Sequence, residues 1–509
     1  MKNMEDFLNI YYESPSMNNY YLDEYNSQIH FIHPLLGYCY KGVIESNIDE
    51  FTFLNGLSFP ISINDIDYTF EQFQYYYNKF LFFKSKGLFI KRYRKNIFSE
   101  LSIKDIENAI SNTEQIVIEM TQCCNLRCVY CAYGELYNKD ELRKDANLSF
   151  SDFRIFFDYL YTSYFNDTNN NSTMKKINIC FYGGEPLLRF DQIKDIVDYV
   201  SVRNKSNLHF TFSITTNGIL LTNRVVEFLY KNDFTILISI DGDKYNNAYR
   251  LFPSGKESFD LLINNIDFIS KMYPAYFVKK IFFSAVLHKR NSVNDINQFL
   301  MNKYNKIAAI GYLNLNSVRS DKMKEIKKIQ NDVVEDLFDD KLQNKNSKSL
   351  LYDKMNVLLK GYDSLSLNSL NELFISKAKF RFNTGTCIPF KKKIFLTVDG
   401  LILPCEKINF KYHLSKIENK RLLLDLKEVL NTHNKMLDLV RCECNKCYYN
   451  LICNRCIYNM PDVDKDNFQC QDYISKKGMI DLLSKITLEL EKKPIMYMDY
   501  YKEHSKFYV

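Results

Sequence analysis

Three cysteines lie close together in the sequence Cys-Asn-Leu-Arg-Cys-Val-Tyr-Cys, at Cys124, Cys128 and Cys131. They directly follow an apolar run at residues 116–120 that we expect to form a β-strand. Thiolates are soft ligands that suit iron–sulfur clusters, and three of them can bind three irons of a 4Fe–4S cube. The fourth iron would then be open to a substrate or a cofactor. The alternatives are a zinc knuckle or reduced cysteines in the core.

A turn rich in glycine follows the next apolar run, residues 177–182, in the sequence Tyr-Gly-Gly-Glu-Pro. Gly183 and Gly184 allow a ligand to approach the backbone closely, and Glu185 offers an acceptor for an ammonium group. Taken alone, these residues are also compatible with an ordinary turn. Their position straight after a strand favours a binding site.

A second group of cysteines lies in the C-terminal part of the sequence. Its members, which bracket Gly400, are Cys387, Cys405, Cys444, Cys447, Cys453, Cys456 and Cys470. Pairs in the pattern Cys-x2-Cys suit zinc as well as iron. The chain has 14 cysteines and no apolar signal segment among its first residues, so metal ligation is favoured over disulfides. A reducing, cytoplasmic location is therefore expected.

Length and charge exclude several classes of protein. At 509 residues the chain is too long for one compact core, and several domains are expected. A net charge of +6 is small for this length and does not indicate nucleic-acid binding. The sequence has no run of about 18 apolar residues, so no membrane-spanning helix is expected.

Apolar runs and helical patterns alternate from about residue 112 onward. Six runs predict strands, at residues 116–120, 177–182, 208–214, 235–240, 281–287 and 308–315. Helical patterns fall between them, at residues 151–165, 222–232, 258–272 and 292–302. This alternation implies an α/β fold with a parallel sheet and right-handed crossovers. In parallel α/β folds the reactive groups lie at the carboxyl ends of the strands, and Cys124 falls at such an end.

The C-x3-C-x2-C spacing, with Tyr130 before the last cysteine, resembles the radical S-adenosylmethionine (SAM) enzymes. In that family the open iron binds the methionyl amine and carboxylate of SAM, and one electron splits the sulfonium to give a 5′-deoxyadenosyl radical. The family's Gly-Gly-Glu-Pro motif matches Gly183, Gly184 and Glu185, so the resemblance implies that these residues meet the methionyl amine. The family's core is a partial (β/α)6 barrel, which the six predicted strands suit.

Further cofactor contacts follow from the same resemblance. Thr216-Asn-Gly218 and Ser239-Ile-Asp-Gly242 look like the family's strand-end motifs, which implies that Ser239 contacts the ribose. Arg250 would bind the cofactor's carboxylate, although its interval from Ser239 is one residue short of the usual pattern. A surface loop arginine is the alternative. Tyr130 would offer backbone contacts to the adenine, and Leu313 would touch it unless it is a core leucine.

The second group of cysteines resembles the SPASM domain, which carries two auxiliary iron–sulfur clusters. The likeness implies a distal cluster held by Cys444, Cys447, Cys453 and Cys470, and a proximal one held by Cys387, Cys405 and Cys456. Cys442 is either a fourth proximal ligand or a neighbour of Cys444. The interval from Cys453 to Cys456 departs from the family, with two intervening residues in place of three. A pair of zinc sites is the alternative.

In this family the SPASM extension mostly accompanies work on peptides. The resemblance therefore implies a maturase that forms a thioether or carbon–carbon cross-link in a ribosomal precursor peptide, with a flavodoxin- or ferredoxin-type electron donor. The alternatives are a sulfatase maturase that makes formylglycine and an iron–sulfur electron carrier or scaffold. Glu406 follows Cys405 where sulfatase maturases carry a catalytic Asp, so it is either the base or a surface carboxylate.

The N-terminal residues have a different pattern. Residues 1–20 look irregular, strands are predicted at 29–33 and 38–44, and a helix is predicted over 69–85. Strands followed by a helix resemble the small winged-helix domain that many peptide-modifying enzymes use to hold a leader peptide. A plain packing or dimerisation domain is the alternative.

These patterns divide the chain into five parts. The expected parts are an N-terminal domain at 1–108, a radical SAM barrel at 109–320, a helical bridge at 321–384, a SPASM domain at 385–475, and a C-terminal helix and tail at 476–509. Within the last part, a helix is predicted over residues 479–491.

Overall fold

The computed structural model describes most of the two ends and nearly all of the central sheet. The described residues are 9–23, 28–86, 89, 101–137, 145–165, 175–205, 208–313, 318–330, 384, 386–449, 453, 455–460, 463, 468–470 and 472–492. Most of the expected helical bridge, from 331 to 383, lies outside them.

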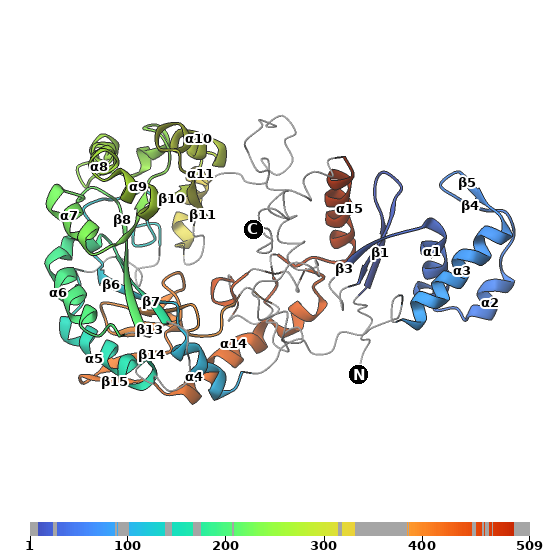
Figure 1. Cartoon of the computed structure of the whole chain (residues 1–509), viewed down its shortest axis with the longest axis horizontal. Helices are drawn as coiled ribbons and strands as arrows, with labels where there is room; N and C mark the ends of the chain where they lie inside the picture. Colours follow the sequence, from blue (N-terminus) through green and yellow to red (C-terminus); the bar gives the residue numbers. More distant parts are fainter. Residues whose placement is uncertain are drawn as a thin grey trace.

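Six parallel strands, arranged in chain order, form a partial barrel at one end of the molecule (Figure 1). They are β6 (Gln115–Thr121), β7 (Lys175–Gly183), β8 (Leu208–Thr216), β9 (Thr235–Ser239), β10 (Ile281–Leu287) and β11 (Ala308–Tyr312). The helices between them are α5 (Phe150–Leu160), α6 (Phe190–Ser201), α7 (Asn223–Lys231), α8 (Phe259–Met272), α9 (Pro274–Lys280) and α10 (Val293–Tyr304). This arrangement confirms the predicted α/β partial barrel.

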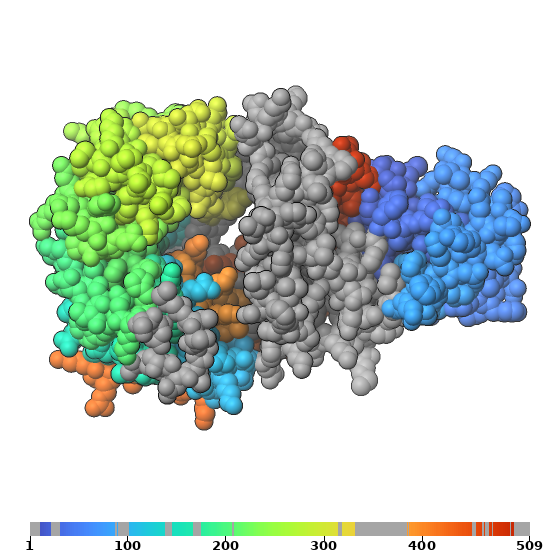
Figure 2. Space-filling view, in the orientation of Figure 1, coloured from blue at the N-terminus to red at the C-terminus, as the bar shows by residue number. Residues whose placement is uncertain are grey.

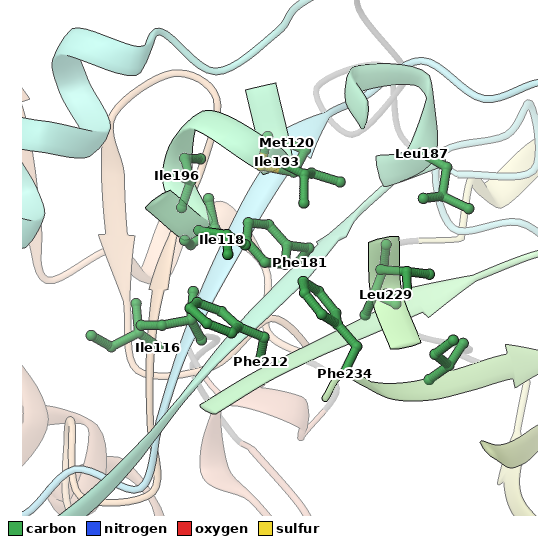
Figure 3. Packing of buried hydrophobic residues seen from close by; sticks show 14 of the residues in the cluster. Ile116, Ile118, Met120, Phe181, Leu187, Ile193, Ile196, Phe212, Leu229 and Phe234 are labelled. Atoms are coloured by element: carbon green, nitrogen blue, oxygen red, sulfur yellow. The ribbon is translucent and has the colours of Figure 1, made fainter. Parts of the chain in front are cut away.

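The strands have one apolar and one polar face, because successive side chains alternate across a sheet. Apolar side chains of the outer face pack against the helices, as Figure 3 shows for Ile116, Ile118 and Phe181. On the inner face the polar side chains bind one another. Asn178 Oδ1 accepts a hydrogen bond from Gln115 Nε2 at 2.8 Å and another from Ser213 Oγ at 2.6 Å. The barrel interior is therefore polar near the amino ends of its strands.

A C-terminal group of strands extends the same sheet beyond β6. Strand β12 (Lys393–Leu396) pairs with β6 in parallel, and β13 (Leu401–Leu403), β14 (Ser415–Glu418) and β15 (Arg421–Leu423) continue it in antiparallel fashion. The result is one sheet of ten strands. A long helix, α14 (Leu426–Lys446), follows and packs on α4 (Ile103–Ser111). The second cysteine group is thus anchored on the barrel's first strand.

The N-terminal domain, residues 9–86 and 89, begins with an antiparallel sheet. Its strands are β1 (Asn9–Glu13), β2 (Asn19–Asp23) and β3 (Gln28–Ile32), in that order. The helical elements α1 (Pro34–Cys39), η1 (Tyr40–Glu45) and α2 (Glu50–Asn55) follow, then a hairpin of β4 (Ile61–Ile63) and β5 (Ile66–Tyr68), and α3 (Phe70–Ser85). The predicted helix over 69–85 is confirmed, and Thr69 caps its start. Figure 2 shows this domain and the barrel at opposite ends of the molecule.

Two predictions for the N-terminal domain are wrong. The strand expected at residues 38–44 is helical, because His33 caps a helix whose first residue is Pro34. Its apolar residues recur at helical spacing and bury one face, with Leu35, Cys39 and Val43 among them. Residues 1–20, expected to be irregular, contain β1 and begin β2. The pairing of β1 with β2 and of β2 with β3 stabilises these strands, and no local pattern in the sequence indicates it.

The C-terminal helix α15 (Lys476–Lys492) lies beside the N-terminal sheet (Figure 1). The carboxylate of Glu491 accepts hydrogen bonds from Tyr20 Oη at 2.6 Å, Asn18 Nδ2 at 3.0 Å and Ser14 Oγ at 3.1 Å. At the other end of the helix, Lys476 Nζ lies 3.4 Å from Glu45 Oε1. The two ends of the described chain are thereby joined.

Among the helices that the structure describes, we find none with the length and apolarity that crossing a membrane requires.

Candidate functional site

The cluster loop, residues 122–131, follows directly on β6. It carries Cys123 and the three predicted ligands Cys124, Cys128 and Cys131, and all four are half-buried. Burial raises the pKa of the Cys128 thiol to about 12; Arg250 opposes the rise, and the neighbouring Cys131 and Cys124 add to it. Cys124 Sγ accepts hydrogen bonds from Leu126 N at 3.4 Å and Asn217 Nδ2 at 3.6 Å. The structure therefore brings the three predicted thiols together in one electrostatic environment.

Backbone hydrogen bonds clamp this loop from two sides. On one side Gly184 N donates to Thr121 O at 2.8 Å, and Glu185 N donates to Cys123 O at 2.9 Å. A Cβ on Gly184 would lie 2.1 Å from Cys123 O, so only glycine permits the approach. On the other side the cluster loop donates from Arg127 N to Leu251 O at 2.6 Å, and from Val129 N to Tyr249 O at 3.0 Å. The loop is therefore held by the glycine-rich turn and by the two residues on either side of Arg250.

Asp241 is the centre of a buried charge network beside the loop. Arg250 binds it with both arms, Nε to Oδ2 at 3.0 Å and a terminal nitrogen to Oδ1 at 3.0 Å. Tyr130 Oη also donates to it, and His288 Nε2 lies 3.6 Å from Oδ2. Although burial alone raises the pKa of Asp241, Arg250 and the other donors hold it below its usual range. Asp241 therefore stays ionised inside the protein.

This network changes the interpretation of Arg250. The resemblance assigned its guanidinium to the carboxylate of a cofactor, whereas here the guanidinium is paired with Asp241 and buried. Asp241 lies within the Ser239-Ile-Asp-Gly242 motif, but the motif by itself indicates no role for it. The signal available was an Asp nine residues before an Arg, and that spacing has no fixed meaning until the turn at 246–249 folds them together.

Glu185 is also occupied by protein donors. Its carboxylate accepts from Thr216 Oγ1 at 2.8 Å, Asn217 N at 2.8 Å and Leu187 N at 3.0 Å. Burial raises the pKa of Glu185 to about 7, although these three hydrogen bonds oppose the rise. The side chain predicted to accept an ammonium group thus joins the carboxyl ends of β7 and β8 in this structure.

The remaining predicted cofactor residues lie at the same end of the sheet. Ser239 ends β9, with its Oγ 3.4 Å from Ser284 Oγ on β10. Leu313 directly follows β11 and is 9% exposed. Tyr130 is buried and stacks on His288 with ring centroids 5.7 Å apart. Ser239 and Leu313 therefore border the region that the cluster loop faces, as the rule for parallel strands predicts.

The second cysteine group is partly assembled. Cys444, Cys447, Cys453 and Cys470, the four predicted distal ligands, line one pocket together with Asp472. Of the predicted proximal ligands, Cys456 lies near Cys387. Burial raises the pKa of Cys456, and the neighbouring Cys387 adds to the rise. Cys405 lies beside Glu406 and Lys393. Cys442 is exposed on α14.

The donor sets fit iron–sulfur clusters. Three half-buried thiols on one loop suit a cube with one open iron, and four thiols around one pocket suit a fully ligated cube. In the part of the chain that the structure describes, no set of three or more His, Cys, Asp or Glu side chains converges on a single-ion site.

Glu406, the predicted base, lies in a protected position. Its side chain is 8% exposed, and its Oε1 accepts from Lys393 Nζ at 2.5 Å. The thiol of Cys405 lies 3.4 Å from its other oxygen. Its charge also acts on Cys180 and Tyr182, two inward-facing residues of β7. Glu406 is therefore a buried, ion-paired carboxylate and not a surface one.

Residues 118–300 match the family model of the Radical SAM superfamily. The cluster loop, the glycine-rich turn and five of the six central strands fall within this match in whole or in part. The chain therefore carries a radical SAM domain, which the resemblance implied. This family implies a 4Fe–4S cluster and SAM as cofactors, and the thiols of the cluster loop fit the cluster.

Two curated relatives and one solved structure are similar to parts of this chain. The cysteine-type anaerobic sulfatase-maturating enzyme of Clostridium novyi is 30% identical over 30% of this chain and 39% of its own length. The radical SAM cyclopropyl synthase TigE of Paramaledivibacter caminithermalis is 27% identical over 40% of this chain and 43% of its own length. The matched region thus spans less than half the length of either relative. Native anSMEcpe with bound AdoMet superposes with a TM-score of 0.50 at 18% identity, covering 76% of this chain and 99% of that one, which shows a shared fold.

Replacing Asp241 by Asn should destabilise the barrel by about 3–5 kcal/mol, because it leaves the buried Arg250 without a counter-charge. The free energy of unfolding in urea would measure this. Asp260→Asn is the matched control, since it breaks an exposed pair with Lys244 (2.7 Å, side chains 73% and 54% exposed). Such a surface pair contributes about 0–1 kcal/mol. Equal losses in the two variants would contradict a structural role for the Asp241 network.

Proposed function

We propose that this protein is a radical SAM peptide maturase that forms an oxidative thioether or carbon–carbon cross-link in a ribosomal precursor peptide. The observation that carries the proposal is the cluster loop: three thiols held at the carboxyl ends of parallel strands, against the glycine-rich turn. The second cysteine group, joined to the barrel through β12, supports a maturase with auxiliary clusters. One of the two relatives is named as a radical SAM cyclopropyl synthase and the other as a sulfatase-maturating enzyme, and both names support a modifying enzyme.

Three 4Fe–4S clusters are proposed. Cys124, Cys128 and Cys131 would hold the first, Cys444, Cys447, Cys453 and Cys470 the distal one, and Cys387, Cys405 and Cys456 the proximal one. When bound, the first cluster and SAM would supply a 5′-deoxyadenosyl radical that removes a hydrogen atom from the peptide. A flavodoxin- or ferredoxin-type protein is the proposed electron donor.

The protein's own part in the reaction is to bind, shield and deprotonate the peptide. Glu406 would accept the proton that leaves as the new bond forms, and an auxiliary cluster, when bound, would take up the remaining electron. Its position supports this, because one of its oxygens lies 3.4 Å from the thiol of Cys405, a proposed cluster ligand. The Glu406 side chain is 8% exposed and Tyr182 is partly buried in an apolar cluster, which supports exclusion of water from the reacting groups.

The N-terminal domain is proposed to hold the leader of the precursor. Within the described residues β3 is at the edge of the sheet, which leaves an edge that an extended peptide can join. Phe31 on β3 is 67% exposed, and His33 stacks on Tyr76 of α3 with centroids 3.7 Å apart. The open edge of β3, with the exposed ring of Phe31 beside it, is the proposed binding surface for the leader. Its rival is a domain that only packs against the rest of the chain.

A sulfatase maturase, converting one Cys or Ser to formylglycine, is the second candidate function. It is favoured by the names of relatives such as the Clostridium novyi enzyme. Incubating the protein with a sulfatase-derived peptide would distinguish the two, since formylglycine, and no cross-link, should form if this candidate is right. A non-enzymatic iron–sulfur carrier or scaffold would give no 5′-deoxyadenosine at all.

The reconstituted protein should contain about 12 irons per chain, four for each of three clusters. Changing Cys124, Cys128 and Cys131 together to Ala should leave about eight and abolish 5′-deoxyadenosine formation, because the SAM-binding cluster is lost. Iron analysis and product chromatography would measure both. Unchanged iron in the triple variant, or zinc in the C-terminal sites, would show that the ligand assignment is wrong.

Glu406→Gln should slow peptide modification by about tenfold or more, because the amide cannot accept the released proton. Cleavage of SAM to 5′-deoxyadenosine should continue, since Glu406 does not lie in the cluster loop. Glu418→Gln, an exposed carboxylate on β14, is the control and should behave as the native protein does. Near-normal product formation by Glu406→Gln would exclude it as the base.

Phe31→Ser should weaken binding of a fluorescently labelled precursor peptide by about tenfold, because an exposed aromatic anchor is lost. Phe51→Ser is the control, since Phe51 is 75% exposed on α2, away from the strand edge. Fluorescence anisotropy measures both affinities. If the two variants bind equally well, the leader is held elsewhere.

A further inference from the structure

Glu119 is the only charged residue of β6, and its side chain is fully buried. It lies on the inner face of the barrel, since its neighbours Ile118 and Met120 belong to the core on the outer face. A carboxylate in such a place is costly unless donors satisfy it, so its partners indicate why it is there. The apolar pattern of residues 116–120 predicts a strand but does not indicate a role for the one carboxylate within it.

The two oxygens of Glu119 bind two different parts of the protein. Tyr133 Oη, two residues after Cys131, donates to Oε1 at 2.7 Å. Val398 N donates to Oε2 at 3.0 Å. Val398 lies in the turn between β12 and β13, the hairpin that leads to Cys405. We call residues 393–405 the auxiliary hairpin. The side chain of Gln122, in the cluster loop, also hydrogen-bonds the carboxylate. One carboxylate thus joins the cluster loop and the segment after it to the auxiliary hairpin.

The contact with Val398 begins where strand pairing stops. Residues Ile118 and Leu396 are the last partners in the ladder between β6 and β12. Beyond them the auxiliary hairpin turns back, with Thr397 N donating to Leu401 O at 3.0 Å. The Glu119 side chain then supplies the acceptor that the next backbone carbonyl of a continuing strand would have offered. The position of the turn therefore depends on this side chain.

A third neighbour limits how Glu119 can move. A Cβ on Gly183, with φ of +126°, would lie 3.4 Å from Glu119 Cγ and 2.3 Å from Thr121 O. The glycine-rich turn thus lies directly against the carboxylate's side chain. Glu119 is enclosed by the glycine-rich turn, Tyr133 and the auxiliary hairpin.

We propose that Glu119 is a positioning residue that fixes the auxiliary hairpin relative to the cluster loop. The proposal rests on the proposed function in that the hairpin carries Cys405. The carboxylate is suited to this task because it presents two acceptors to two donors on separate segments. Removing it leaves the buried Val398 N–H and the Tyr133 hydroxyl without their acceptor, and both segments become free to shift.

Four variants separate positioning from other roles. Glu119→Ala removes the contacts with Tyr133 and Val398 and also the one with Gln122. Glu119→Gln keeps the first two, because its oxygen can accept from Val398 N while its amide donates to Tyr133 Oη. Tyr133→Phe removes only the contact with the segment after the cluster loop. Gln115→Ala is the matched control, a polar inner-face residue of the same strand whose amide binds Asn178.

Amide hydrogen exchange of the reconstituted protein, read over residues 131–137 and 397–400, is the decisive measurement. Glu119→Ala should speed exchange in both segments by about tenfold, equivalent to loss of about 1.4 kcal/mol of local stability. Tyr133→Phe should affect 131–137 alone. Glu119→Gln and Gln115→Ala should match the native protein. Electron paramagnetic resonance of the reduced protein should differ from the native spectrum only in Glu119→Ala and Tyr133→Phe.

Two results would overturn the proposal. One is native exchange at either segment in Glu119→Ala; the other is equal damage by Glu119→Gln and Glu119→Ala, which would make the charge essential and not the contacts. If Glu119→Ala does not fold, Tyr133→Phe still decides. Equally fast exchange at residues 131–137 and 397–400 in that variant would contradict two separate contacts of Glu119. The exchange measurement does not require turnover. Lack of 5′-deoxyadenosine in the native protein would therefore refute the proposed function and leave this test intact.

Discussion

The parallel pairing of β12 with β6 is the interaction on which the rest of this structure depends. Strand β6 carries the cluster loop at its carboxyl end, and its other edge is bonded to β7, which carries the glycine-rich turn. A shift of one residue in either ladder would turn the inner face of β6 outward, because side chains alternate along a strand. The register of β6 therefore fixes both the thiols and the auxiliary hairpin in one frame.

Three buried carboxylates stabilise this frame near the carboxyl ends of its strands. Asp241 binds Arg250 and Tyr130, Glu185 binds Thr216 and Asn217, and Glu119 binds Tyr133 and Val398. Each joins segments that are distant in the sequence. Burying a charge is costly, so such groups persist where several donors offset the cost. The result is a rigid surround for a loop that has little regular secondary structure of its own.

Local signals account for what the sequence predicted well. The six central strands were identified because each is an apolar run longer than a turn, and the cluster loop because its spacing is short and specific. Strands β12 to β15 were missed because three or four residues carry too weak a pattern. Segment 38–44 was wrongly assigned because a short apolar stretch fits both periods, and only the cap at His33 decides. The partners of Arg250 and Glu185 were not predictable, since they lie across turns that no local pattern describes.

The docking of α15 on the N-terminal sheet has a consequence for the order of biosynthesis. Strand β1 ends at Glu13, whereas Glu491 is near the end of α15, so the sheet leaves the ribosome long before its docking helix is made. At about 5–20 residues per second this interval is on the order of a minute. The N-terminal domain has an apolar core of its own, around Tyr21, Leu35 and Phe80. It can therefore fold early as a tethered module, and the radical SAM barrel is completed before the two ends of the described chain meet.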